Sequence, residues 1–305
     1  MSALTTAFEQ ACARAAVACQ PWIGQRNKGA ADAAAVAAMR AAFATVPMIG
    51  RIVIGEGERD EAPMLFIGEQ VGEGRGEAVD IAVDPLEGTT LCAENRPGAL
   101  CVAAFAPRGE LLHAPDVYMQ KLVAGPGLRL LPDDLDRPAE DVLARLAAEV
   151  EGPLRVVMLD RPRHRPMMEA ARAVGAALSL IADGDVMGAL QTALTDSATG
   201  LPPYHVYMGS GGAPEGVLAA SGLKALGGSM LGRLLFRDEA ERARARNLGL
   251  HDLERVYTLS DLASPAAHLV LAGVTADVLD GVQGGRVHVL TLSPDQPPRR
   301  QFLTL

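Results

Sequence analysis

The sequence has few cysteines and no cysteine motif. None of the four cysteines (Cys12, Cys19, Cys92 and Cys101) belongs to a C-x-x-C pair. Neither a zinc knuckle nor a disulfide framework is therefore indicated. Reduced thiols are the expected state. A redox role for Cys92 stays open as an alternative, because this residue lies just past an acidic turn at residues 84–90.

Long apolar runs and an excess of positive charge are also absent. No apolar run approaches the length of a membrane span, and the first residues lack the basic-then-apolar order of a signal peptide. The sequence therefore predicts a cytoplasmic protein. The formal net charge of −9 argues against general binding to nucleic acid or to an anionic membrane. With 49% apolar and 21% charged residues, the composition is typical of a globular protein.

The length and the spacing of prolines and glycines predict two domains. A chain of 305 residues can bury a sizeable core and hold two domains. Prolines and glycines interrupt residues 126–153, so we expect α/β domains at 1–150 and 151–305. Beyond residue 153 predicted strands and helices alternate, which favours a parallel or mixed sheet covered by helices.

The most informative stretch is residues 80–90. An apolar strand at 78–83 leads to Asp84, and Pro85 is expected to stop the strand because it has no N–H to donate. Gly88 allows a sharp bend. Asp84 and Glu87 can then point into one space at the end of a sheet, where α/β proteins bind ligands. The alternative is a turn whose acids only hydrogen-bond local amides.

Other acids also stand where a predicted element begins or ends. Asp32 opens a predicted helix, where the helix dipole alone would favour an acid. Glu215 lies in a glycine-rich turn at 209–216, and the loop at 55–61 precedes a helix predicted from Pro63 to about Gln70. Hard cations such as Mg²⁺ and Mn²⁺ prefer carboxylate oxygens. The pattern predicts a site for two or three metal ions. The loop at 55–61 contributes the acids Glu56, Glu58, Asp60 and Glu61.

The same regions contain groups that could bind an anion. Backbone N–H groups at 88–90 and 211–212 can face a phosphate. A basic cluster at 161–165 could do the same, although a solvated basic face is an equally good interpretation. The turn at 183–185 has two acids, of which Asp185 could simply be a helix N-cap. For Lys28, the alternative interpretation is that it is an ordinary exposed lysine.

Several motifs, in family order, resemble one enzyme family. Residues 84–89 (Asp-Pro-Leu-Glu-Gly-Thr) resemble the signature of lithium-sensitive, metal-dependent sugar and inositol phosphatases. Residues 55–65 (Gly-Glu-Gly-Glu-Arg-Asp-Glu-Ala-Pro-Met-Leu) are similar to the most specific segment of one branch, the class II fructose-1,6-bisphosphatases. The resemblance runs from about residue 5 to the end. It also includes residues 114–119, 162–164, 183–186 and 211–216.

The resemblance implies a fold and a site. The implied fold is a layered αβαβα arrangement of two mixed sheets, with an N-terminal metal-binding and a C-terminal sugar-phosphate-binding domain. Two or more Mn²⁺ or Mg²⁺ ions would be the cofactor, and a homodimer or homotetramer is implied. The implied metal ligands are Asp32, Glu56, Asp84, Glu87 and Glu215. The implied catalytic residues are Glu56, Asp60 and Thr89. The implied substrate contacts are Lys28, Glu87, Gly88, Thr89, Tyr118, Arg163, His164, Arg165, Asp183, Gly184, Asp185 and Gly212.

The implied reaction is hydrolysis of the 1-phosphate of fructose 1,6-bisphosphate in carbohydrate metabolism, either gluconeogenesis or the Calvin cycle. Sedoheptulose 1,7-bisphosphate is the nearest alternative substrate, followed by an inositol or nucleotide phosphate. A metal-binding regulatory protein without activity is the alternative from another class. The sequence departs from the family pattern at two positions. Arg165 stands where some relatives have an acid, and Ser210 stands where an aliphatic residue is usual. It is also shorter after Arg237. These departures bear on substrate preference and subunit contacts.

Overall fold

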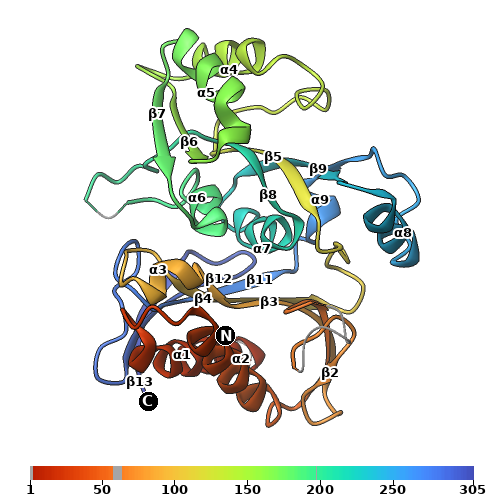
Figure 1. Ribbon diagram of the computed structural model, residues 1–305, viewed down its shortest axis with the longest axis vertical. Coiled ribbons are helices and arrows are strands. Elements are labelled where there is room, and N and C mark those ends of the chain that lie inside the picture. Colours follow the sequence, from red (N-terminus) through yellow and green to blue (C-terminus); the bar gives the residue numbers. More distant parts are fainter. Residues whose placement is uncertain (1–2, 58–63, 197) are drawn as a thin grey trace. The chain divides into compact units, whose positions relative to one another are not determined.

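The chain forms two compact units, and the division does not follow the expected boundary at residue 150. A computed structural model describes residues 3–57, 64–196 and 198–305 (Figure 1). The first unit combines the chain up to His113 with Ser264–Leu305, and the second is Ala114–Ala263. The expected boundary within 126–153 lies inside the second unit. The reason is strand pairing, because the last strands of the chain join the sheet made by the first.

The first unit contains a seven-stranded mixed sheet in the order β13-β12-β11-β4-β3-β1-β2. The neighbours β1 and β3 are parallel, whereas every other pair is antiparallel. The C-terminal strand β11 pairs directly with β4, with Val270 opposite Ala103. This pairing brings the chain after residue 264 back to the first unit. The strands are β1 (Met48–Ile54), β2 (Gln70–Val71), β3 (Glu77–Glu87), β4 (Leu100–Pro107), β11 (His268–Gly273), β12 (Arg286–Leu292) and β13 (Arg299–Thr304).

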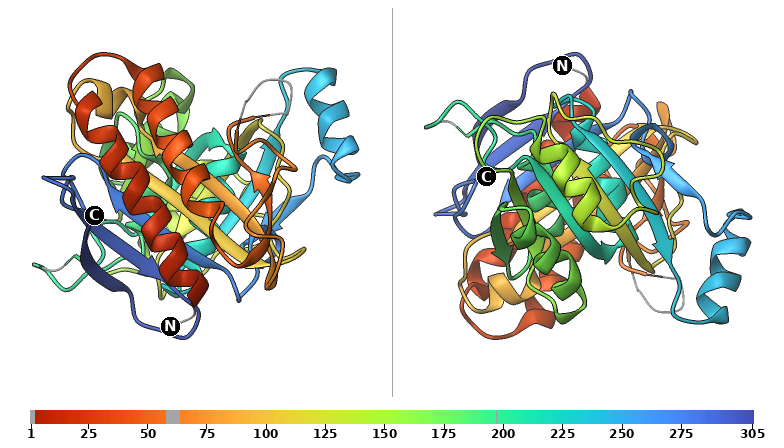
Figure 2. Two further views of the ribbon diagram at one scale, coloured as in Figure 1. Left: turned by 90° about the horizontal axis from the view of Figure 1, so that it is seen from below. Right: turned by 90° about the horizontal axis from the view of Figure 1, so that it is seen from above.

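Two alanine-rich helices cover one face of this sheet. They are α1 (Ala3–Cys19) and α2 (Lys28–Phe43), which lie side by side across the strands (Figure 2, left). Small alanines let the helices approach closely, and Phe8, Met39 and Phe43 fill the core against Ile81. The helix α3 (Thr89–Ala93) follows β3, and a 3-10 turn, η1 (Gln20–Trp22), follows α1. All four cysteines are free and buried.

Two local predictions in this unit are wrong. Pro85 does not stop the strand, since β3 continues to Glu87. The ladder shifts between Asp84, opposite Val102, and Glu87, opposite Leu100. At this bulge residue 85 donates no ladder hydrogen bond, so Pro85, which has no N–H, can lie within the strand. The helix expected up to Gln70 is also absent from the described part of that segment, because residues 64–69 form turns and residues 70–71 form β2.

The second unit contains a six-stranded mixed sheet in the order β10-β9-β5-β8-β6-β7. The pairs β6–β7 and β6–β8 are parallel, and the other pairs are antiparallel. The alternation of strands and helices beyond residue 153 is confirmed here, because β6, β7 and β8 are separated by helices. The strands are β5 (Tyr118–Ala124), β6 (Arg155–Leu159), β7 (Ala177–Ile181), β8 (Val206–Gly212), β9 (Ser229–Leu235) and β10 (Val256–Thr258).

Helices cover both faces of the second sheet (Figure 1). Leu122, Val156 and Met208 join a core cluster with α4 and α5. Because side chains alternate along a strand, Lys121 and Tyr207 point to the opposite face, where α6 and α7 lie. The helices of this unit are η2 (Pro162–His164), α4 (Ala139–Ala147), α5 (Arg165–Ala173), α6 (Asp185–Leu190), α7 (Ala213–Leu223), α8 (Glu239–Asn247) and α9 (Leu259–Leu262).

The expected fold class is confirmed, because each unit is a mixed sheet with helices packed on it. Among the described residues, no helix has both the length and the apolar character needed to cross a membrane.

Candidate active site

The first unit brings two predicted metal ligands close to each other. Glu56 follows β1, and its backbone N–H donates to the carbonyl of Leu65 over 3.0 Å. Burial, and then the negative charge of Asp32 on α2, raise the pKa of Glu56 to about 7. Burial also raises the pKa of Asp32. No cation of the described residues contributes to either shift. Two mutually repelling carboxylates of this kind fit a hard divalent cation.

Gly55 makes the approach of this loop possible. A Cβ atom at residue 55 would stand 1.9 Å from the carbonyl oxygen of Leu65, which is far inside contact distance. Only glycine therefore allows Glu56 to leave β1 at this point. The remaining acids of the loop, Glu58, Asp60 and Glu61, lie outside the described residues.

Asp84 and Glu87 stand on either side of the bulge in β3. The Oδ1 atom of Asp84 accepts a hydrogen bond from the N–H of Leu86 over 3.1 Å, and Glu87 is buried. Gly88 follows with a φ of 79° and begins α3, whose first residue is the half-buried Thr89. The left-handed conformation explains the glycine. Within the described residues, no three acids, histidines or cysteines form a group that could hold a metal ion. The complete ligand set therefore stays a prediction.

In the second unit, Arg163 lies over the ring of Tyr118 with its guanidinium carbon 4.9 Å from the ring centroid. Its Nε donates to the hydroxyl of Ser210 over 3.0 Å, and its Nη2 donates to the carbonyl of the same residue over 2.6 Å. Ser210, which departs from the family pattern, therefore orients the predicted phosphate-binding cation. Tyr118 itself is 40% exposed.

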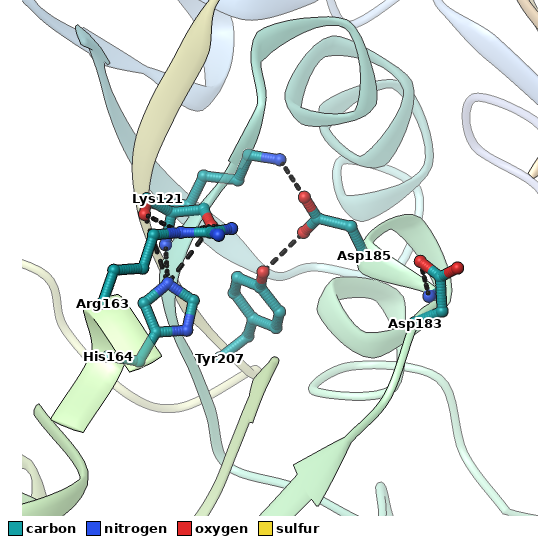
Figure 3. Close-up of polar contacts among 8 residues, drawn as sticks. Lys121, Arg163, His164, Asp183, Asp185 and Tyr207 are labelled. Atoms are coloured by element: carbon teal, nitrogen blue, oxygen red, sulfur yellow. Dashed lines mark hydrogen bonds and ion pairs between the residues drawn. The ribbon is translucent and has the colours of Figure 1, made fainter. Parts of the chain in front are cut away.

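His164 is fully buried and engaged within the protein. Its Nδ1 lies 2.8 Å from the carbonyl oxygen of Leu159, and its Nε2 accepts from the N–H of Ser210 over 2.9 Å (Figure 3). Burial lowers the pKa of His164, and the nearby charge of Arg163 acts in the same direction. The ring is therefore neutral, with the proton on Nδ1. It positions Ser210 and Arg163 and does not offer a positive charge to a phosphate.

A pocket of about 290 Å³ opens in the second unit beside Tyr118. Glu215, in the first turn of α7, has its pKa raised by burial, and the charge of Lys121 partly offsets this shift. Its Oε2 lies 1.9 Å from where a Cβ of residue 212 would stand, so a side chain at 212 would displace this carboxylate. The pocket is lined by Asp116, Val117, Tyr118, Gly212, Glu215 and Arg237.

Two charged lining residues had no predicted role. Asp116 lies inside the family segment 114–119 but had no assigned role. Arg237 follows β9 and is held at the pocket by an ion pair with the buried Glu241. A single arginine in a charged stretch has no spacing that distinguishes it, so no signal in the sequence pointed to it.

The predicted substrate turn lies between β7 and α6. Gly184 has a φ of 93°, and its N–H donates to Oδ1 of Asp183 over 3.2 Å. Asp185 is the first residue of α6 and is only 7% exposed. The alternative interpretation of Asp185 as an N-cap is wrong, since Gly184 occupies that position. The other two predicted contacts, Lys28 and Arg165, are exposed at the starts of α2 and α5.

Comparison with known proteins defines the class of this protein. Residues 2–293 match the model of a family described as bacterial fructose-1,6-bisphosphatase, glpX-encoded, whose members are metal-dependent phosphoric monoester hydrolases. The chain belongs to this family of glpX-encoded bacterial fructose-1,6-bisphosphatases.

Similar proteins carry a double name. The D-fructose 1,6-bisphosphatase class 2/sedoheptulose 1,7-bisphosphatase of Prochlorococcus marinus (strain MIT 9313) is 40% identical over 297 residues, which cover 92% of this chain and 86% of that protein. Proteins with the same name from Parasynechococcus marenigrum (strain WH8102) and Synechococcus sp. (strain RCC307) are each 41% identical. The matches cover 88% and 90% of this chain, and 83% and 84% of those proteins.

Proposed function

We propose that this protein hydrolyses the 1-phosphate of fructose 1,6-bisphosphate to give fructose 6-phosphate and inorganic phosphate. The observation that carries the proposal is the match of residues 2–293 to the family model. Two features of the structure support it. The repelling carboxylates of Asp32 and Glu56 suit a metal-dependent enzyme, and Arg163 beside Tyr118 offers a guanidinium of the kind that binds phosphate.

The proposed cofactor is Mn²⁺ or Mg²⁺, in two or more sites. Asp32, Glu56, Asp84 and Glu87 are the proposed ligands of the first unit, and Glu215 is the proposed ligand of the second. When bound, these ions supply positive charge that favours attack of water on phosphorus and stabilises the phosphoryl oxygens.

The chain's own groups would orient the reactants. The hydroxyl of Thr89, at the start of α3, is proposed to hold the attacking water, and Asp60 is proposed to support the site near the metals. Arg163 would bind the distal phosphate, which positions the reacting phosphate at the other end of the sugar. The further proposed contacts are Lys28, Glu87, Gly88, Tyr118, Arg165, Asp183, Gly184, Asp185 and Gly212, and His164 would act through Ser210 and Arg163.

Sedoheptulose 1,7-bisphosphate is the second candidate substrate. The observation that favours it is the double name shared by the similar cyanobacterial proteins. Both sugars present a primary phosphate at carbon 1 and a distal phosphate, so one cationic site could serve both. An inositol or nucleotide phosphate, or a regulatory role without turnover, has no comparable support.

The test is a substrate panel measured by phosphate release, with Mn²⁺ and Mg²⁺ compared. The panel contains both bisphosphates, fructose 6-phosphate, inositol 1-phosphate and a nucleoside monophosphate. We expect metal-dependent release from fructose 1,6-bisphosphate and little from the monophosphates. Release from inositol 1-phosphate alone, or metal and sugar-phosphate binding without any turnover, would overturn the proposal.

Two broader expectations belong to the same proposal, namely a cytoplasmic location and a homo-oligomer of two or four chains. Light scattering of the purified protein would measure the number of chains. A strictly monomeric protein with full activity would contradict the second expectation.

A further inference from the structure

The proposed function leaves the buried charge of Lys121 unexplained. Lys121, in the middle of β5, is only 1% exposed. A buried lysine is costly unless it is paired. Its position on the strand that also carries Tyr118 places it in the predicted sugar-phosphate unit, although no motif of the sequence pointed to it.

The partner of Lys121 is Asp185, at the end of the predicted substrate turn. The Nζ atom of Lys121 donates to Oδ2 of Asp185 over 2.6 Å. The hydroxyl of Tyr207, on β8, donates to the other oxygen, Oδ1, over 2.5 Å. Figure 3 shows Asp185 between these two donors. Both carboxylate oxygens therefore accept short hydrogen bonds from within the protein.

The same carboxylate also packs against the backbone of the glycine-rich turn. Its Oδ2 lies 1.8 Å from where a Cβ of residue 211 would stand, so Gly211 is needed for this approach. Asp185 thus joins three segments of the second unit: the turn at 183–185, strand β5 and strand β8, which ends at Gly212. The turn and the end of β8 both carry predicted contacts to the sugar phosphate.

This geometry fixes Asp185 within the second unit, because losing either hydrogen bond would leave a buried lysine or tyrosine without a partner, which is expensive. Each carboxylate oxygen keeps a further lone pair that can accept from a substrate hydroxyl. Asp183 differs, because it is only partly buried and, within the part of the chain that the structure describes, accepts only from the adjacent N–H of Gly184 over 3.2 Å.

We propose that Lys121 and Tyr207 are positioning residues for sugar-phosphate binding. They hold Asp185, which in turn holds the turn at 183–185 and the end of β8 (residues 211–212) in the conformation that binds the substrate. This inference rests on the proposed function, because it concerns the substrate of that site.

The first test replaces Lys121 with methionine, which is unbranched and one atom shorter and carries no charge. For Lys121→Met we expect the KM for fructose 1,6-bisphosphate to rise at least about tenfold, equivalent to about 1.4 kcal/mol of binding. We expect kcat to change by less than about threefold, because the reacting phosphate is not contacted by this network. Lys224→Met is the matched control, since Lys224 is exposed in the same unit and should leave both constants unchanged.

Binding is then measured without turnover. Calorimetry with the product fructose 6-phosphate, in the presence of metal, should show about the same tenfold loss in Lys121→Met. An unchanged affinity and KM in a folded variant would overturn the inference. A wild-type protein that binds fructose 6-phosphate but releases no phosphate from any bisphosphate would refute the proposed function instead, so the two failures are distinguishable.

A double-mutant cycle tests whether Lys121 acts through Asp185. If it does, Lys121→Met combined with Asp185→Asn should bind fructose 6-phosphate no more weakly than Asp185→Asn alone. If the fold-losses of affinity in the two single variants multiply in the double variant, Lys121 contacts the ligand independently of Asp185. That result would overturn the inference. If Lys121→Met fails to fold, Tyr207→Phe serves in its place. It removes one hydroxyl and should raise KM about threefold with an unchanged kcat, and no change in KM would count against the proposal.

Discussion

The two units treat buried acids in opposite ways. In the first unit, burial raises the pKa of both Asp32 and Glu56, the charge of Asp32 raises that of Glu56 further, and no cation of the described residues offsets these shifts. In the second unit, Asp185 has a lysine and a tyrosine hydroxyl on its two oxygens. The difference indicates that the first pair of acids is arranged for a charge supplied from outside the chain. The charge of Asp185 is already compensated within the chain, and its contacts hold segments of the second unit together.

The largest effect should come from removing an acid of the first kind. We expect Glu56→Ala to lower metal-dependent phosphate release by about 10²–10³-fold or more, because a charge that stabilises the reacting phosphoryl group would be lost. Glu94→Gln is the matched control, since Glu94 is an exposed acid of the same unit. Activity of Glu56→Ala within a few-fold of wild type would refute the assignment.

A large but more selective effect is expected for the cation of the second unit. Arg163→Ala should raise the KM for fructose 1,6-bisphosphate about 10–100-fold, the usual value of a charge-assisted hydrogen bond to phosphate. A substrate with a single phosphate should be affected much less. Arg172→Ala, on the exposed face of α5, should leave both KM values unchanged. Equal losses on both substrates would show that Arg163 acts on the general shape of the site.

The acids of the first unit should also make stability depend on pH. Because the pKa of Glu56 is raised to about 7 in the folded state, the folded protein binds more protons than the unfolded chain between about pH 4.5 and 7. Without metal, the free energy of unfolding should therefore fall across this range, on the order of 1–3 kcal/mol. Urea unfolding with a chelator would measure it.

Two comparisons sharpen that experiment. Glu56→Gln cannot ionise at this position, so its stability should change less between pH 5 and pH 8. Added Mn²⁺ or Mg²⁺ should stabilise the wild type more at pH 8 than at pH 5, because the ions bind the ionised carboxylates. Stability that rises with pH in the chelated wild type would contradict the proposed state of Glu56.

The smallest effect is expected at Ser210. In Ser210→Ala, Arg163 loses the hydroxyl acceptor but keeps the backbone carbonyl, which lies 2.6 Å from Nη2. We expect KM for the bisphosphate to rise only about two- to threefold, in steady-state assays at saturating metal. A loss as large as that of Arg163→Ala would mean that the hydroxyl, and not the guanidinium charge, determines binding.

Much of the architecture could be predicted from local pattern. The predicted alternation of strands and helices beyond residue 153 is close to the observed elements from β6 to α7, because helix and strand periods are visible in the sequence itself. Pro85 misled the prediction because a missing N–H normally ends a strand, whereas a bulge in the pairing with β4 takes it up. The boundary near residue 150 was misplaced because proline-rich connections also occur within a unit.

By itself, the sequence determined the family, the fold class and the types of chemical group at the site, since these depend on residue identity and short spacing. Only the tertiary structure decided which groups face each other. The pairing of β4 with β11 returned the last 42 residues (Ser264–Leu305) to the first unit. The alternation of β5 and β8 placed Lys121 and Tyr207 on the two oxygens of Asp185. The two contacts to Asp185 join residues 22 and 64 positions apart, separations over which a local sequence pattern carries no information about pairing.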